Sequence, residues 1–303
     1  MAGKIVKDDK TENYEKHLAY DLKGHNIIKI QRVAQKNING NNYYLIMMEK
    51  AILGDLGKFS DFFHNHCLPS LIINPFNELV GDNLLRFYCK QIINALEILD
   101  RCNYVHLDLK PENLLISIDL VIKLSDFSLL KKIKDIEKTK IPIRTNGYKS
   151  LDYYKNKGNI SAKEARKQDY FSLGETLYFL KYGKQMLNFQ KFNDKESYMI
   201  SMVDQLEKEI ISINNGIFTD KDFVNFIKDL ISYETKDIPN FEQIYRNKWL
   251  NKNIEKLSQI LLLYDNDERK KILIELQKYD YVIEMEKNVN KNPSRFRYKK
   301  RKL

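Results

Sequence analysis

The amino-acid sequence predicts an α+β protein in which strands come first and helices follow. Two apolar β-type segments, residues 28–33 and 43–48, flank the turn-rich residues 37–42, which is typical of a hairpin. Further along, apolar residues recur at helical spacing over residues 82–101, 170–182, 197–213, 221–232 and 240–247. We therefore expect a small β-rich part followed by a larger, mostly helical part.

Two of the predicted helices have additional sequence signals. Asp9 and Glu12 have the spacing of a capping box, and an apolar stripe then runs to Leu22, which predicts a short helix over residues 10–22. Residues 82–101 carry apolar side chains on nearly every face, which indicates a helix that is buried on all sides.

The composition is that of a globular chain with a sizeable core. Of its 303 residues, 43% are hydrophobic and 30% are charged. No segment approaches the roughly 18 consecutive apolar residues of a membrane span, and residues 1–10 lack the apolar core of a signal peptide. We therefore expect an intracellular protein, cytoplasmic or nuclear, without a membrane span.

The end of the chain has a different character. Residues 253–264 and 267–285 have the pattern of amphipathic helices, so a helical extension is expected over residues 251–286. Six of the eight residues 295–302 are basic and contribute much of the net charge of +10. Residues 287–303 are expected to form a basic disordered tail, which is either simply solvated or bound by an acidic partner or a nuclear import receptor.

Residues 104–116 contain the chemistry around which the chain is organised. Between two apolar β-type segments lie an acid, a base and an amide, namely Asp108, Lys110 and Asn113. Phosphoryl transfer needs a carboxylate to orient a hydroxyl, an ammonium for the phosphate and an amide oxygen for a metal. The segment resembles the H-R-D-L-x-x-x-N loop of eukaryotic protein kinases, and the lysine is typical of the serine/threonine branch.

Three further segments match the same family in the same order. Asp126-Phe127-Ser128 resembles the D-F-G motif, residues 169–174 resemble D-x-W-S-L-G, and residues 242–250 are similar to the closing E-x-I-x-x-H-P-W-L segment. Four collinear matches over about 150 residues are far more specific than one. The chain is identified as a member of the eukaryotic protein kinase superfamily.

The resemblance implies a bilobal protein kinase-like fold over residues 1–250. A truncated small β-rich lobe is expected at 1–49 and a large, mostly helical lobe at 50–250, with ATP and Mg²⁺ between them. Ala2-Gly3-Lys4 resembles the A-x-K strand of the family, and the glycine-rich loop that precedes this strand is not in the sequence. One interpretation is that Met1 lies within a longer, complete kinase.

The resemblance also implies roles for the residues of the loop. Asp108 would orient the substrate hydroxyl, and Lys110 would contact the γ-phosphate of ATP. Asn113 and Asp126 would hold magnesium. His106 would pack beneath the phenylalanine of the D-F-G-like segment, as a core residue rather than a base.

The remaining nucleotide contacts are expected from the small lobe and its connection to the large one. Lys4 would bind the α- and β-phosphates and pair with Glu15. Backbone groups near Glu49 and Ala51 would hydrogen-bond to the adenine ring. Further on, Thr145 and Tyr148 fit the G-T-x-x-Y pattern that receives the substrate residue.

Four positions depart from the family pattern. Leu107 replaces an arginine that binds an activation-loop phosphate, so switching by that route is not expected. Ser128 replaces a glycine and removes backbone freedom. Asp152 and Ile238 replace a buried glutamate–arginine pair, so Asp152 is predicted to lie near the surface or to have another partner, and Ile238 to pack against apolar neighbours.

Two functions fit these residues. The first is a protein serine/threonine kinase that transfers the γ-phosphate of ATP to a protein hydroxyl, which the retained carboxylates and amide favour. The alternative is a pseudokinase, a nucleotide-binding or scaffolding module, which the missing glycine-rich loop, the serine after Asp-Phe and the altered A-P-E segment favour.

Overall fold

The computed structural model describes residues 1–7, 22–62, 76–117, 121–138, 140–142, 147–186, 220–231 and 239–251, with a few isolated residues between 197 and 208. Its strands and helices are β1 (Ala2–Lys7), β2 (Ile30–Ile38), β3 (Asn41–Met48), α2 (Leu56–Phe62), α4 (Phe76–Arg101), β4 (Tyr104–Val105), β5 (Leu114–Ile116), β6 (Ile122–Leu124), β7 (Lys131–Lys132), α5 (Leu151–Lys155), α6 (Ala162–Tyr182), α8 (Lys221–Ile231) and α9 (Phe241–Tyr245).

The first three strands form an antiparallel sheet in the order β1-β3-β2. The two loop residues between β2 and β3 are Asn39 and Gly40, whose φ angles of 51° and 79° are left-handed. Two-residue hairpin loops favour Asn-Gly because both residues tolerate positive φ. The predicted hairpin is confirmed, with strands that run closer to the turn than the apolar pattern indicated.

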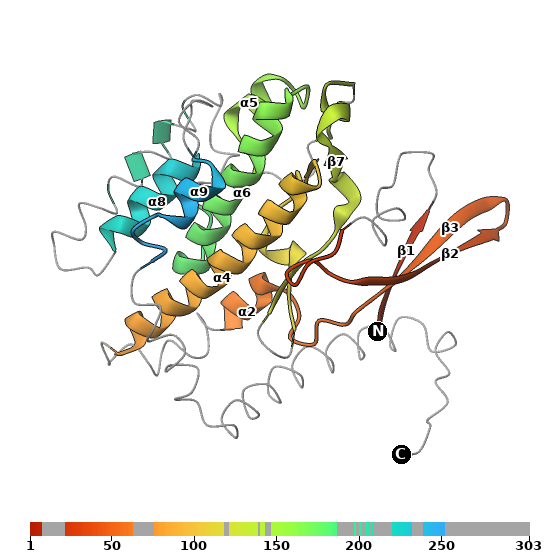
Figure 1. The fold of residues 1–303 in the computed structure, drawn as a ribbon, viewed down its shortest axis with the longest axis horizontal. Coiled ribbons are helices and arrows are strands. Elements are labelled where there is room, and N and C mark those ends of the chain that lie inside the picture. Colours follow the sequence, from red (N-terminus) through yellow and green to blue (C-terminus); the bar gives the residue numbers. More distant parts are fainter. Residues whose placement is uncertain are drawn as a thin grey trace, which may run out of the picture.

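Helices α4, α6 and α8 share one hydrophobic core, and Figure 1 shows the helical part on the opposite side of the molecule from the sheet. Helix α4 is buried along its C-terminal half, as predicted, but begins earlier than residue 82, at Phe76. It packs against α6, which in turn packs against α8. Trp249, in the closing segment, is fully buried, and its ring centroid lies 5.0 Å from that of Phe223 and 5.4 Å from that of Phe226.

Helix α6 begins eight residues before the predicted start, at Ala162 rather than at residue 170. Its start has a capping box: Ser161 Oγ accepts a hydrogen bond from the Glu164 N–H, and Glu164 Oε2 accepts one from the Ser161 N–H. Gly183 ends the helix with a φ of 68°. The prediction was based on apolar residues, and it therefore left out the first two turns of the helix, which are mostly polar.

The sheet is connected to the helical part through Asn26, which is 3% exposed. Its Nδ2 donates to Gln91 Oε1 on α4 and to the carbonyl of Ile122 on β6, and its Oδ1 accepts from Asn94 Nδ2. The next residue, Ile27, forms a parallel bridge with Leu124. These bonds fix the segment that leads into β2 on the large lobe.

Several predictions concern residues outside those that the structure describes. These are all but the last residue of the helix at 10–22, including Glu15, most of the helix at 197–213, Thr145, Ile238, nearly all of the extension at 251–286, and the tail at 287–303. In the described part of the chain, no helix is long and apolar enough to cross a membrane.

Candidate active site

The loop at 106–113 lies between β4 and β5 and carries three of the predicted site residues. Pro111 opens a short 3-10 turn, where its missing N–H leaves no hydrogen bond unmade. Asn113 Nδ2 donates to the Asp108 carbonyl at 2.7 Å and lies 3.2 Å from Asp108 Oδ2. Lys110 Nζ lies 3.0 Å from the same carboxylate oxygen. The acid, the ammonium and the amide of the loop thus form one hydrogen-bonded group.

Asp169 on α6 fixes the backbone of this loop. Its carboxylate accepts hydrogen bonds from the N–H of His106 at 2.7 Å and from the N–H of Leu107 at 2.8 Å. Leu107 is held in a left-handed conformation, with a φ of 65°, which is unfavourable for a residue with a Cβ. Burial raises the pKa of Asp169 to about 6, while the two N–H groups act in the opposite direction.

His106 supports the loop as predicted. Its ring packs edge-on against Phe127, with the ring centroids 5.6 Å apart. Nε2 lies 3.0 Å from the Ser125 carbonyl, and Nδ1 lies 3.3 Å from the backbone N–H of Asp108. A neutral imidazole with its proton on Nε2 satisfies both bonds. Burial lowers the pKa of His106 to about 4, so the ring stays neutral at physiological pH.

Asp126 follows strand β6 and faces the sheet. Its φ of 57° is left-handed, which aspartate tolerates better than most residues. Its Oδ1 lies 2.8 Å from Lys4 Nζ on β1, so the ion pair connects residues 122 positions apart. Burial by itself would raise the pKa of Asp126, but the hydrogen bond and charge of Lys4 outweigh burial and lower it.

The serine after Asp-Phe fits this conformation without strain. Ser128 lies in a 3-10 turn, Phe127–Leu129, and its φ is not in the left-handed region. Its N–H donates to Asp126 Oδ1 at 3.4 Å. The predicted loss of backbone freedom therefore does not affect the state seen here, because this state does not require glycine.

The predicted nucleotide contacts of the small lobe are partly described. Lys4 faces Asp126, while its predicted partner Glu15 lies outside the described residues, so that pairing stays a prediction. The Glu49 N–H donates to the Lys29 carbonyl at 2.9 Å, which leaves the Glu49 carbonyl as the backbone group that an adenine ring can contact at this residue. Ala51 follows β3 by three positions, in the connection to the large lobe.

Lys149 is a residue of the site that the sequence did not reveal. Its side chain is 0% exposed, and its Nζ donates to the Leu107 carbonyl and lies 3.5 Å from Asp108 Oδ1. Asp108 thus has a lysine at each carboxylate oxygen, Lys149 at Oδ1 and Lys110 at Oδ2. In a chain with 51 lysines and arginines, nothing in the sequence distinguishes Lys149 from an exposed lysine.

These two lysines determine the charge state of Asp108. Burial by itself would raise the pKa of the Asp108 carboxyl, but Lys149 and Lys110 outweigh it, and the pKa is lowered. Asp108 is therefore ionised at neutral pH and accepts hydrogen bonds through both oxygens.

Asp152 has a new partner, one of the two outcomes predicted for it. Its Oδ2 lies 2.7 Å from Lys167 Nζ on α6, and the lysine side chain is 2% exposed. The pair joins the start of α5 to α6. Ile238, at the place of the family's arginine, lies outside the described residues.

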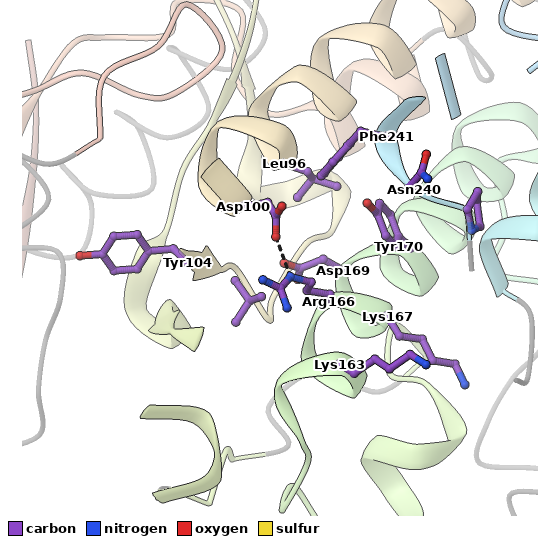
Figure 2. Close-up of a pocket in the computed structure, with 12 residues that line it drawn as sticks. Leu96, Asp100, Tyr104, Lys163, Arg166, Lys167, Asp169, Tyr170, Asn240 and Phe241 are labelled. Atoms are coloured by element: carbon purple, nitrogen blue, oxygen red, sulfur yellow. Dashed lines mark hydrogen bonds and ion pairs between the residues drawn. The ribbon is translucent and has the colours of Figure 1, made fainter. Parts of the chain in front are cut away.

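A cavity of about 250 Å³ lies behind the loop, on the α6 side. Figure 2 shows Asp169 and Tyr170 beside it, with Phe241 close by and an ion pair between Asp100 and Arg166. None of the residues that line it is Asp108, Lys110, Asn113 or Asp126. The cavity is therefore separate from the predicted phosphoryl-transfer site.

Comparison with known proteins gives the family. The family model for the protein kinase domain matches residues 1–250. The chain belongs to the protein kinase domain family. Within this kinase domain lie all the predicted site residues, from Lys4 to Asp126.

The relatives of this kinase domain include serine/threonine-protein kinases. The chain is 26% identical over 256 residues to "Serine/threonine-protein kinase atg1" of Dictyostelium discoideum, a match covering 84% of this chain and 34% of that protein. It is 31% identical over 173 residues to "Hormonally up-regulated neu tumor-associated kinase" of Mus musculus, a match covering 55% of this chain and 22% of that protein. The chain thus spans about a third of the first relative's length and about a fifth of the second's.

A protein kinase domain uses ATP and a divalent metal, and the residues present fit both. Asp126 offers a carboxylate, and Asn113 offers its amide oxygen, because its amide nitrogen is bound to the Asp108 carbonyl. Oxygen ligands of this kind suit Mg²⁺, which proteins usually hold with one or two carboxylates and the substrate phosphates. Among the described residues no three His, Cys, Asp or Glu form a metal site on their own.

Proposed function

We propose that this chain is a protein serine/threonine kinase that transfers the γ-phosphate of ATP to a protein hydroxyl. The observation that carries the proposal is the hydrogen-bonded group of Asp108, Lys110 and Asn113. It supplies the acceptor, the cation and the amide oxygen that this chemistry needs, and Lys4 of the small lobe pairs with Asp126 of the large lobe.

Each residue has a role that its contacts support. Asp108 accepts the hydrogen bond of the attacking serine or threonine hydroxyl and orients its oxygen toward the γ-phosphate. Because the pKa of Asp108 is lowered, the carboxylate is a weak base and acts mainly by orienting the hydroxyl. It accepts the proton only when the hydroxyl oxygen loses electron density to the phosphorus and the hydroxyl becomes more acidic. Lys110, 19% exposed beside Asp108, is placed to meet the negative charge of the transferring phosphate.

The nucleotide is held from both lobes. Asn113 and Asp126 would hold Mg²⁺, which when bound neutralises charge on the phosphates. Lys4 binds the α- and β-phosphates after it separates from Asp126, with Glu15 as its predicted partner on the small lobe. The Glu49 carbonyl and the backbone of Ala51 contact the adenine ring.

A second candidate function is a nucleotide-binding or scaffolding module without transfer. It is favoured by the altered A-P-E segment, in which Asp152 stands at the place of the family's glutamate and pairs with Lys167. The contacts of Asp108, Lys110 and Asn113 favour transfer, since a binding module does not require them.

Transfer is tested with purified chain, labelled ATP, Mg²⁺ and a mixed protein substrate, followed by phosphoamino-acid analysis. We expect label on serine or threonine, at a rate that Asp108→Asn lowers at least 100-fold, because the neutral amide no longer accepts the hydroxyl proton. Asp135→Asn, at a surface ion pair with Lys138, serves as the matched control and should keep the rate. Equal rates for the parent and Asp108→Asn would exclude the proposed role of Asp108.

A further inference from the structure

Lys149 makes the contacts of a residue that positions the loop. Its ammonium reaches the backbone of Leu107 and the carboxylate of Asp108 at the same time, from a side chain that is 0% exposed. An isolated buried cation is strongly unfavourable, so its presence requires partners that hold it. The Leu107 carbonyl and the Asp108 carboxylate are these partners.

The backbone that carries Lys149 is itself fixed on helix α6. The Tyr148 carbonyl accepts hydrogen bonds from Gln168 Nε2 at 2.6 Å and from Ser172 Oγ at 2.8 Å. The Ser150 N–H donates to Gln168 Oε1 at 2.8 Å. Lys149 therefore extends from a rigid support, and its side chain connects α6 to the loop.

Leu107 is held from both ends of its backbone. Asp169 Oδ1 accepts from its N–H at 2.8 Å, and Lys149 Nζ donates to its carbonyl. Its φ of 65° persists because these two contacts act on opposite sides of one residue. The same backbone conformation determines where the next residue, Asp108, projects its carboxylate.

The groups facing Lys149 account for its charge. Burial lowers the pKa of the Lys149 ammonium, while the carboxylates of Asp108 and Asp169 act in the opposite direction and Lys110 adds to the lowering. The ammonium also lies 5.2 Å from the centre of the Tyr153 ring. Two carboxylates and an aromatic ring thus surround one cation.

We propose that Lys149 is a positioning residue for phosphoryl transfer. By binding the Leu107 carbonyl and the Asp108 carboxylate together, it fixes the loop from the segment that enters α5 and keeps Asp108 in its productive orientation. The inference rests on the proposed function for its effect on rate, but the contact itself can be tested without transfer.

The transfer assay compares the parent chain with Lys149→Met, Lys149→Arg and Lys167→Met. For Lys149→Met we expect kcat to fall at least about tenfold while the KM for ATP changes less than about twofold, because Lys149 touches neither substrate. Lys149→Arg, which keeps a cation, should restore most of kcat. Lys167→Met removes another buried lysine, paired with Asp152, and should leave kcat within about twofold of the parent.

Two results of the assay would overturn the proposal. One is a folded Lys149→Met chain with kcat within about twofold of the parent. The other is an equal loss in Lys167→Met, which would mean that any buried lysine matters through stability alone. If Lys149→Met does not fold, Lys149→Gln takes its place with the same expected loss, because it keeps a donor for Leu107 but not the charge.

Thermal unfolding separates this proposal from the proposed function. The midpoints are measured for Lys149→Met, Asp108→Asn and the double variant. Non-additive shifts show that the two side chains act together, even if the parent chain transfers no phosphate and the kinase proposal fails. Additive shifts would overturn the inference whatever the activity.

Discussion

At the residue scale, Asp126 has two competing partners. In the structure it pairs with Lys4, and both side chains are more than a third exposed. Ion pairs with this exposure contribute about 0–1 kcal/mol. Separating the two side chains therefore costs little, as the proposed binding of phosphate by Lys4 and of Mg²⁺ by Asp126 requires.

Asp126→Asn is expected to remove the magnesium-dependent part of the stabilisation by ATP. The amide has the shape of the carboxylate but not its charge, so it loses the metal and little packing. Ligand stabilisation follows mass action, so it is measured as the shift in Tm at saturating ATP, with and without Mg²⁺. An Mg²⁺-dependent shift of the same size in parent and variant would contradict the assignment of Asp126 as a metal ligand. No shift in the parent would favour the scaffolding module over the kinase.

At the scale of elements, the contact between α6 and α8 depends on Gly174. A Cβ at this position would lie 2.7 Å from Ile231 Cγ2 and 3.3 Å from Leu230 Cβ. At this position the two helices therefore approach more closely than a side chain would allow. The same helix carries Asp169 one and a half turns earlier. The packing of α6 against α8 therefore also helps to position Asp169, which holds the backbone of the loop.

Gly174→Ala is expected to destabilise the fold by about 1–3 kcal/mol, because the added methyl group overpacks the α6–α8 contact. In an open helix the same change would stabilise by up to about 1 kcal/mol. The free energy of unfolding, measured with urea, decides between these signs. Ile231→Leu moves the obstructing methyl group away from the β-carbon and should relieve part of the loss in the double variant, whereas a stabilising Gly174→Ala would show that the helices are farther apart.

At the scale of the whole molecule, stability depends on pH through a buried glutamate on α6. Glu175 is 1% exposed, one of its oxygens has no hydrogen-bond partner among the described residues, and the other is 3.5 Å from the Met186 N–H. Burial raises its pKa to about 8 from the ordinary 4.5, with the Met186 bond acting in the opposite direction. The folded chain keeps this carboxyl neutral at pH 7.

Glu175 should make the fold less stable as pH rises from 4.5 to about 8. In that range the folded state holds a proton that the unfolded state has lost, so the free energy of unfolding falls by up to about 1.4 kcal/mol per pH unit. Above this range both states have lost the proton, so Glu175 no longer changes the free energy of unfolding as the pH rises. Glu175→Gln stays neutral and should flatten this part of the profile, measured by urea unfolding between pH 5 and 8; parallel profiles for the two chains would refute the assignment.

Local sequence patterns predicted much of the fold and the part of the site that lies within the loop. The hairpin, α8 and the burial of α4 follow from the spacing of apolar residues and from Asn39-Gly40, which act within a few positions. Asp108, Lys110 and Asn113 also lie within six residues of one another, so the sequence alone indicates their shared chemistry. The start of α6 was missed because its first turns carry polar residues and its capping box is the only signal there.

What the sequence by itself determined is the family and the order of its motifs, because these depend on residue types at short, constant spacings. Only the tertiary structure decided that Lys4 pairs with Asp126, that Asp152 pairs with Lys167, and that Lys149 is buried against Asp108. These pairs join residues 15 to 122 positions apart. Which lysine among many becomes buried depends on how α6 and the loop pack together, and no local pattern records that packing.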